Sequence, residues 1–586
     1  MNFKRIQSLW KTATPTSGIT EDASEALFRK WVVAIAMLIV PPLLLFIYYK
    51  LMFRGLMNPD AMDFAQLGRN LSSGHGFSTL ILRPLALPPG SHGLNALAQP
   101  DVTHGPLYPF LLALAFGMNS QHGANDATVA IVSGVFYLLT IPVMYILGVR
   151  VFSNAVGLLS VVILTFNTLF LEYAASGLPI TLYIFLMTCL MLVVYNIAVR
   201  SRTAGGKLPV SQYVLAGVFT GLLYLTDPIF IWIVPFVIGT IYTLTPSRKP
   251  QAIAAILLPM CILMLPWMAR NAMLTTNPVF GLKGMEIWMN TNGYYPDLTA
   301  YRQFPSEILP GVGVFTAIVK KMVLEIGQII LVFPQLSASW ILAFLLPCLL
   351  FQFANTAANA LRRLMMFCLL GLIFGSLFFH IEMPIFVSLV PVMLVYSVAY
   401  LLHLTQQAQL RPGAIRLIGA LIAGMLIFPL LSSTVLADKP SELKEVDEAR
   451  FMNTRMQPGD IAFSDQPWLV AWYAGRPAVW IPMNDAKIET IQSTLFANTK
   501  HWLFLTSKIQ QPQLLFSRGW GAAYNLFYQA DRQVNSPMPT AVYPAFSLRD
   551  RDAVLAALQN YKSVPSAKPS TSSVAIGEGP ESGKTH

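Results

Sequence analysis

Long apolar runs, separated by short polar segments, occupy about the first three quarters of the chain. A helix needs about 20 apolar residues to cross the hydrocarbon core of a bilayer. Runs of about this length predict eleven membrane-spanning helices, at roughly 31–53, 127–149, 152–171, 178–199, 211–226, 229–245, 251–269, 338–357, 364–381, 384–404 and 414–436. Two further runs stay open, because 106–118 is short and 317–333 contains Lys320, Lys321 and Glu325. The pattern predicts an α-helical polytopic membrane protein with about eleven spans, or thirteen if both open runs cross.

Basic residues favour one of these two topologies. With eleven spans, the basic segments between the runs all fall on one side of the membrane: Arg150, 200–207, 246–249, 361–363 and the loop of Arg411 and Arg416. Loops rich in Lys and Arg face the cytoplasm, so eleven spans fit better than thirteen. Residues 1–30 are then a cytoplasmic N-terminus, and the first run is an uncleaved signal anchor. Two long loops, 54–126 and 270–337, and the C-terminus are predicted on the extracytoplasmic face.

The chain changes character after residue 437, where the membrane domain of 31–437 ends. Segments typical of strands (458–465 and 501–507) alternate with helix-like segments. This alternation predicts a small α/β domain at 438–561. The last residues, 562–586, are rich in Pro, Ser and Gly, a composition typical of disorder.

Composition supports a membrane protein and excludes other classes. The chain is 55% hydrophobic and only 11% charged, with a mean hydropathy of +0.56, whereas soluble domains carry roughly 25% charged residues. The net charge of +11 is spread over short loops between apolar runs, so it does not indicate nucleic-acid binding. The cysteines all lie in apolar runs and predict neither a disulfide nor a metal cluster: Cys189, Cys261, Cys348 and Cys368.

Two aspartates, Asp60 and Asp63, follow the first span within one helical turn of each other. A carboxylate at a membrane face is costly unless it is solvated, paired or functional. Phe64, Leu67 and Leu71 fall on one side of the following segment, which predicts an amphipathic helix lying at the interface. Asp60 could cap this helix through backbone N–H groups or take part in chemistry, and the pattern leaves both readings open.

Five stretches along the chain carry a resemblance. In the first, Asp60 is followed by Phe64, Leu71, Gly74 and the sequence GFS at 76–78. The others are HGPLYPFLLALAFG (104–117), GLLYLTDPIFIWIVP (221–235), LPWMARNAMLTTNPVFG (265–281) and FHIEMPIFVSLVPVML (379–394). Together they resemble polyprenyl-phosphate-sugar-dependent glycosyltransferases of the membrane-embedded GT-C fold, such as protein O-mannosyltransferases and bacterial aminoarabinose lipid A transferases. The segment SDQPWLVAWYAGRPAVWIP (464–482) also resembles the C-terminal domain of bacterial members.

The chain departs from the family pattern at four places. Ala61 follows Asp60 where the mannosyltransferases have Glu, and Asp227 stands where many members have Arg. Glu382, Met383 and Pro384 replace the usual Arg-Tyr pair, and 176–183 lacks the acidic residue common there. The replacement of the Arg-Tyr pair removes an arginine suited to phosphate binding.

The resemblance implies a reaction and the residues for it. A sugar linked through phosphate to a polyprenol is attacked at its anomeric carbon by a hydroxyl or amine of a lipid, glycan or protein acceptor, with inversion. Asp60 is the implied base, and Asp63 could supply a second carboxylate. The implied substrate-binding residues are Arg270, His104, Tyr108, Lys283, Tyr295 and His380. No metal ligands are assigned, although a divalent metal is left open.

Simpler roles stay open for several of these residues. Arg270 could anchor its span by snorkelling to the interface. His104 could be a solvated loop histidine like His75, His92 and His122, whose irregular spacing does not indicate metal binding. The remaining alternatives are capping or packing for His380, loop packing for Tyr294 and Tyr295, interfacial placement for Glu172, and helix capping for Asp227. Lys283, Arg302, Lys320 and Lys321 share the second external loop and are weaker candidates than Arg270 for the phosphate.

The competing functions are a lipid-linked-sugar flippase or transporter and an inactive scaffold on the same fold. A flippase would carry charges deep within its spans, whereas here the spans are nearly free of charge and polar residues gather on one face. The absence of internal targeting signals and the many prolines point to a bacterial inner membrane, with the C-terminus in the periplasm.

Overall fold

The computed structural model describes residues 23–87, 99–118, 124–203, 210–245, 249–289, 297–304, 313–332, 336, 340–436, 444–484, 487–488, 491, 500–506, 520 and 541–544. The chain divides into two compact units. The first contains Met1–Thr79, Pro100–Leu298 and Pro310–Glu442, and the second contains Leu80–Gln99, Thr299–Leu309 and Leu443–His586. The tail predicted to be disordered lies outside the described residues.

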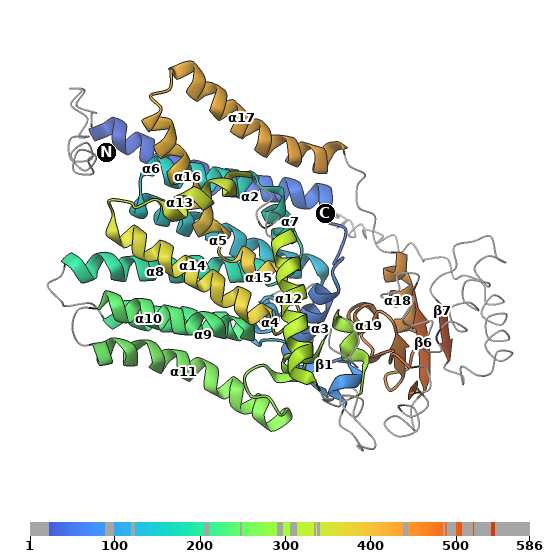
Figure 1. Ribbon diagram of the computed structural model, residues 1–586. Helices are drawn as coiled ribbons and strands as arrows, with labels where there is room; N and C mark the ends of the chain where they lie inside the picture. The colour runs from blue at the N-terminus through green and yellow to red at the C-terminus, as the bar shows by residue number, and fades with distance from the viewer. Residues whose placement is uncertain are drawn as a thin grey trace, which may run out of the picture. The chain divides into compact units, whose positions relative to one another are not determined.

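The first unit is helical (Figure 1). Its α-helices are α2 (Ala23–Met52), α3 (Pro59–Ser72), α4 (Leu107–Met118), α5 (Asp126–Val151), α6 (Asn154–Phe166), α7 (Thr168–Ala175), α8 (Ile180–Thr203), α9 (Val210–Thr226), α10 (Val234–Leu244), α11 (Lys249–Leu274), α12 (Val314–Val332), α13 (Leu345–Leu350), α14 (Thr356–Ser376), α15 (Met383–Val387), α16 (Val390–Gln407) and α17 (Pro412–Leu431). Shorter elements are η2 (Pro228–Ile233), η3 (Gly281–Trp288), η7 (Trp340–Phe344), η8 (Ser432–Leu436) and the strand β1 (Ser78–Thr79).

Six helices in the described part are long and apolar enough to cross a membrane: α2 from Trp31, α5, α8, α11, α14 and α17 with η8. The pair α6 and α7 adds a seventh if it is one broken span, bent by 61°. This bend has a local cause, because Asn167 lies between the two helices and its side chain accepts the Leu169 N–H. The chain is thus a multi-pass membrane protein. Neither open run, in α4 and α12, is among these helices, and the number of eleven spans stays a prediction.

Small residues let the helices of this unit approach closely. Gly148 of α5 faces Gly157 of α6, where a Cβ added to Gly148 would lie 2.7 Å from the Gly157 Cα. Gly217 of α9 presses against the Ile256 carbonyl of α11 in the same way. Figure 1 shows α9 and α11 lying side by side. Such small-residue contacts are typical of membrane helix packing, where van der Waals contact drives association.

The second unit contains a five-stranded sheet in the order β2-β5-β4-β6-β7. The strands are β2 (Ile81–Leu82), β4 (Ile461–Ser464), β5 (Ala478–Trp480), β6 (His501–Leu505) and β7 (Ala541–Pro544), accompanied by η1 (Pro84–Ala86), α18 (Lys444–Arg455), α19 (Pro467–Leu469) and η9 (Val470–Ala474). Pairing is parallel except between β6 and β7. The unit also takes in residues 80–99 and 299–309, which the contiguous boundaries 438–561 did not include.

Two elements fall at the division between the units: β3 (Gln99–Pro100) and η4 (Asp297–Arg302). The predicted strands at 458–465 and 501–507 correspond to β4 and β6. The described part of 438–561 thus combines helices and strands as the alternation indicates.

Candidate functional site

Helix α3 carries both aspartates of the opening motif, and its start corrects the capping interpretation. The N-cap is Asn58, whose side chain accepts the Asp60 N–H at 2.8 Å. Pro59 occupies the first helical position, which suits its fixed φ and its missing N–H. The prediction that Asp60 itself caps the helix is therefore wrong. Asp60 lies in the first turn with an exposed side chain, where the partial positive charge of the helix end favours a carboxylate.

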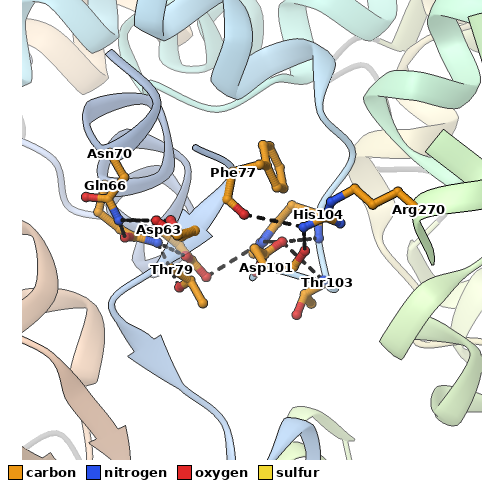
Figure 2. A network of polar contacts seen from close by, with 10 residues as sticks. Asp63, Gln66, Asn70, Phe77, Thr79, Asp101, Thr103, His104 and Arg270 are labelled. Atoms are coloured by element: carbon orange, nitrogen blue, oxygen red, sulfur yellow. Dashed lines mark hydrogen bonds and ion pairs between the residues drawn. The ribbon is translucent and has the colours of Figure 1, made fainter. Parts of the chain in front are cut away.

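Most of α3 is covered by other parts of the protein, and its placement at the membrane interface stays a prediction. Every residue from Ala61 to Gly68 is buried. Three polar side chains at helical spacing, Asp63, Gln66 and Asn70, lie on this buried surface. Gln66 Nε2 donates to Asp63 Oδ1 at 3.1 Å and to Thr79 Oγ1 at 2.9 Å. This polar stripe joins the helix to the following segment, as Figure 2 shows.

His104 lies between two buried aspartates (Figure 2). Its Nδ1 is 3.3 Å from Asp101 Oδ2 and its Nε2 is 3.5 Å from Asp63 Oδ2. The same Asp101 oxygen accepts the backbone N–H groups of Thr103 at 3.1 Å and His104 at 2.9 Å. Only a doubly protonated imidazole can donate to both carboxylates at once. With its side chain 12% exposed, His104 is a packed and paired residue and not a solvated loop histidine.

Arg270 braces the first loop from the end of α11. Its Nη2 donates to the carbonyl oxygens of Asp101 at 2.8 Å and Phe77 at 3.3 Å. The guanidinium lies 4.6 Å from the Trp267 ring centre and 5.2 Å from that of Phe77. These contacts are with protein, so snorkelling does not describe this side chain. Its Nη1 is buried and has no hydrogen-bond partner in the described part of the chain.

Tyr108, predicted to contact substrate, packs inside the helical unit. It is fully buried, and its hydroxyl donates to the Gly177 carbonyl at 2.8 Å and lies 2.8 Å from Ser133 Oγ. Its ring meets Phe64 edge-on at 5.5 Å. The structure therefore gives Tyr108 a packing role, which corrects the predicted substrate contact.

A second polar cluster unites the two places where family arginines are missing. Lys283 Nζ donates to Asp227 Oδ2 at 2.9 Å and to Glu382 Oε1 at 2.8 Å. Asp227 also accepts the Ile229 N–H at 2.9 Å, which confirms the predicted cap. Burial lowers the pKa of Lys283, but the carboxylates of Asp227, Glu382 and Glu286 outweigh it and raise that pKa well above its usual value. Lys283 is thus a cation held by two carboxylates, not an open loop cation.

The remaining basic residues considered for the phosphate form hydrogen bonds within the protein. Lys321 is buried and donates to the carbonyl oxygens of Glu286 at 2.6 Å and Phe378 at 3.1 Å. At His380, the backbone N–H donates to Glu286 Oε2 at 2.9 Å. Arg302 is buried in the second unit, where its Nε donates to the Ile481 carbonyl.

Several predicted residues fall elsewhere. Lys320, His75 and Glu172 are exposed. Tyr294, Tyr295, His92 and His122 lie outside the described residues.

Tyr183 is a candidate that the sequence did not suggest. It is 3% exposed and packs its ring edge-on against Phe230 at 5.3 Å. The carboxylates of Asp227, Glu382 and Asp60 all lie within electrostatic range of its hydroxyl. No described residue forms a hydrogen bond with that hydroxyl. Its segment had drawn attention only for lacking an acidic residue, so nothing local marked the tyrosine.

Asp101 was also missed, although a signal was present. An aspartate three residues before a histidine, in DVTH, is typical of a turn in which the carboxylate accepts N–H groups ahead of it. The structure shows such a turn.

Among the described residues, no group of three or more His, Cys, Asp or Glu side chains is arranged to hold a metal ion. The divalent metal that the sequence left open therefore has no assigned ligands there.

Comparison with known proteins identifies the fold. No protein-family model and no curated protein matches this chain. A crystal structure of the Archaeoglobus fulgidus oligosaccharyltransferase in complex with Zn and sulfate is similar over 85% of this chain and 70% of its own, with a TM-score of 0.53 and 13% identity. A crystal structure of ArnT from Cupriavidus metallidurans bound to undecaprenyl phosphate is similar over 89% of this chain and 97% of its own, with a TM-score of 0.50 and 11% identity.

Both of these proteins are GT-C glycosyltransferases, so the resemblance predicted from the sequence motifs is confirmed at the level of the fold. The chain has the GT-C architecture.

Proposed function

We propose that this chain is an inverting glycosyltransferase that moves a sugar from a polyprenyl phosphate to a hydroxyl or amine of a lipid, glycan or protein acceptor. The reaction takes place on the extracytoplasmic face of a bacterial inner membrane, where the positive-inside rule puts α3 and the second loop. Support comes from the GT-C fold shared with a protein that binds undecaprenyl phosphate and with an oligosaccharyltransferase. A fold hosts several activities, so the site has to carry the argument.

The exposed carboxylate of Asp60 is the observation that carries this proposal. Asn58 performs the capping, so helix formation does not need the Asp60 side chain at the N-cap. Asp60 accepts the proton of the acceptor hydroxyl while the oxygen forms a bond to the anomeric carbon. The bond from that carbon to the phosphate oxygen breaks, and polyprenyl phosphate leaves with the electron pair. One displacement inverts the anomeric centre and needs only one carboxylate base.

Asp63 and Arg270 have supporting roles in this reaction. Asp63 is buried and engaged with Gln66 and His104, so it orients α3 and does not contact substrate. Arg270 has one buried guanidinium nitrogen without a described partner, and it is the cation we assign to the departing phosphate. Cationic donors stabilise charge that develops on a leaving phosphate.

The test is sugar transfer by the purified full-length chain, comparing Asp60→Asn with Asp447→Asn. Asp447 is a matched control, because it also lies exposed in the first turn of a helix, α18. Loss of a general base lowers the rate by about 10²–10⁴-fold. We expect that loss for Asp60→Asn with donor binding retained, and no change for Asp447→Asn.

Other outcomes separate the alternatives. Equal transfer by the intact chain and Asp60→Asn would refute Asp60 as the base. Binding of donor without transfer by either protein would favour an inactive scaffold. Movement of lipid-linked sugar across sealed vesicles without transfer would favour a flippase.

A further inference from the structure

Three polar groups of the helical unit retain hydrogen-bonding capacity in one place. The Tyr183 hydroxyl has no hydrogen-bond partner among the described residues, although the residue is 3% exposed. Lys283 Nζ uses two of its three N–H groups, on Asp227 and Glu382. Glu382 uses Oε1 for that contact, and its side chain is 37% exposed. Each of these groups can therefore still form hydrogen bonds with a ligand.

These groups come from separate elements that meet at one point. Tyr183 lies on α8, Lys283 on η3 and Glu382 directly before α15. Lys283 forms ion pairs with Asp227 and Glu382. The Tyr183 hydroxyl lies within electrostatic range of both carboxylates and of Asp60. The carboxylate of Asp60, the proposed base, therefore lies near the same tyrosine as the carboxylates of the cluster.

We propose that Tyr183, Lys283 and Glu382 bind the sugar being transferred, and that the negative charge around them selects sugars without an anionic substituent. This proposal rests on the proposed function, and it names the class of donor. Sugar hydroxyls both donate and accept, so a hydroxyl, an ammonium and a carboxylate side by side match their chemistry.

Charge provides the selectivity. Asp227 and Glu382 oppose the single positive charge of Lys283, which leaves an excess of one negative charge, and Asp60 adds another. Glu286 lies within electrostatic range of both Lys283 and Lys321, and its Oε2 accepts the His380 N–H. A carboxylate on the sugar would enter a site that is already negative, and like charges at short range repel.

A purely structural role is the competing explanation. In that case the ion pairs only tie η3 to the helix ends, and replacing the Tyr183 hydroxyl or the Glu382 charge would leave donor choice unchanged. The experiment therefore measures selectivity and not stability alone.

The experiment is donor binding by the full-length chain in nanodiscs, using undecaprenyl phosphate carrying matched sugars. Three pairs differ only at C6: glucose and glucuronate, galactose and galacturonate, and mannose and mannuronate. We expect the neutral member of the best-bound pair to bind at least about tenfold more tightly, a factor that corresponds to about 1.4 kcal/mol. Glu382→Gln should reduce this ratio severalfold, and the matched control Glu172→Gln should leave it unchanged.

A second variant keeps the test decisive if Glu382→Gln folds poorly. Tyr183→Phe removes a hydroxyl that has no described partner, so a structural role predicts no loss of stability. We expect this variant to bind both members of a pair about fivefold more weakly, with the ratio between them preserved.

The results separate this proposal from the proposed function. Equal or tighter binding of uronates, or a ratio that Glu382→Gln does not move, would overturn the subsite while transfer still occurred. Selective binding without any transfer would refute the glycosyltransferase and leave the site standing. If the chain bound none of the donors, both the sugar site and the glycosyltransferase function would be overturned.

Discussion

Replacing Lys283 by Met tests the buried charge cluster most directly. The Lys283 side chain is 6% exposed and makes ion pairs with Asp227 and Glu382 at 2.9 and 2.8 Å. Methionine fills a similar volume but leaves two carboxylates facing each other without a cation. Of these, Asp227 is 10% exposed and Glu382 is 37% exposed, so Asp227 bears most of the cost.

The expected magnitude follows from these exposures. Removing one partner of a buried ion pair costs about 3–5 kcal/mol. Water around Glu382 screens part of this cost, which puts the expected loss near the lower end, at about 3 kcal/mol. A loss of 1 kcal/mol lowers Tm by roughly 2–4 °C in a domain of about 150–250 residues and by less in larger ones. We expect the apparent Tm to fall by about 3–8 °C.

The buried cysteines provide the assay. Cys189, Cys348 and Cys368 are buried, so a thiol-reactive fluorophore labels them only as the helical unit opens on heating. The melting curve of the detergent-solubilised chain gives the apparent Tm. Asp227→Asn and the double variant Lys283→Met/Asp227→Asn complete a double-mutant cycle.

The double-mutant cycle also shows which result would refute the stabilising role of the Lys283–Asp227 ion pair. Asp227→Asn in the Lys283→Met background removes one of the stranded charges, so the double variant should be about 1–2 kcal/mol more stable than the sum of the single losses predicts. Additive losses, or a Lys283→Met protein that melts at the wild-type temperature, would show that the buried pairs do not stabilise the unit as argued.

Two further predictions concern Tyr108 and Arg270. Tyr108→Phe leaves the buried Gly177 carbonyl without its donor, so it should cost about 1–3 kcal/mol, and the same melting assay should show a lower Tm without a matching loss of donor affinity. Arg270→Lys loses the contacts of the planar guanidinium with Phe77 and Trp267 and should loosen the first loop. In the intact chain the Asp101 N–H donates to the Phe77 carbonyl, and we expect its hydrogen exchange to become about tenfold faster in the variant. Unchanged exchange would contradict the bracing role.

Several features could be predicted because they depend on neighbouring residues. Apolar length predicted the helices, and most apolar runs correspond to helices in the structure. Asp227 before Pro228 predicted a cap, since an aspartate followed by a proline is a local helix-start signal. The same reasoning failed at Asp60 because the helix begins at Pro59, two residues earlier than a cap at Asp60 requires, and Asn58 is the cap.

The buried face of α3 shows why other predictions failed. Asp63, Gln66 and Asn70 look like a solvent-facing stripe when only the helix is considered. Their partners, Thr79, Ser78 and His104, come from segments that the helical pattern does not connect to them. A polar residue is stable inside protein once its hydrogen bonds are satisfied, and that condition depends on chain segments brought together by folding.

The sequence by itself determined a polytopic membrane protein with GT-C motifs, because hydropathy and motif order are properties of the chain read in one dimension. Only the tertiary structure decided which charged groups act together. Lys283 meets Asp227 across 56 residues and Glu382 across 99, and Tyr183 of α8 lies within electrostatic range of both carboxylates. The physical reason is that an ion pair depends on distance in space and not on distance along the chain. Asp227 and Glu382 look like two separate departures from the family pattern in the sequence, but in the structure both contact Lys283.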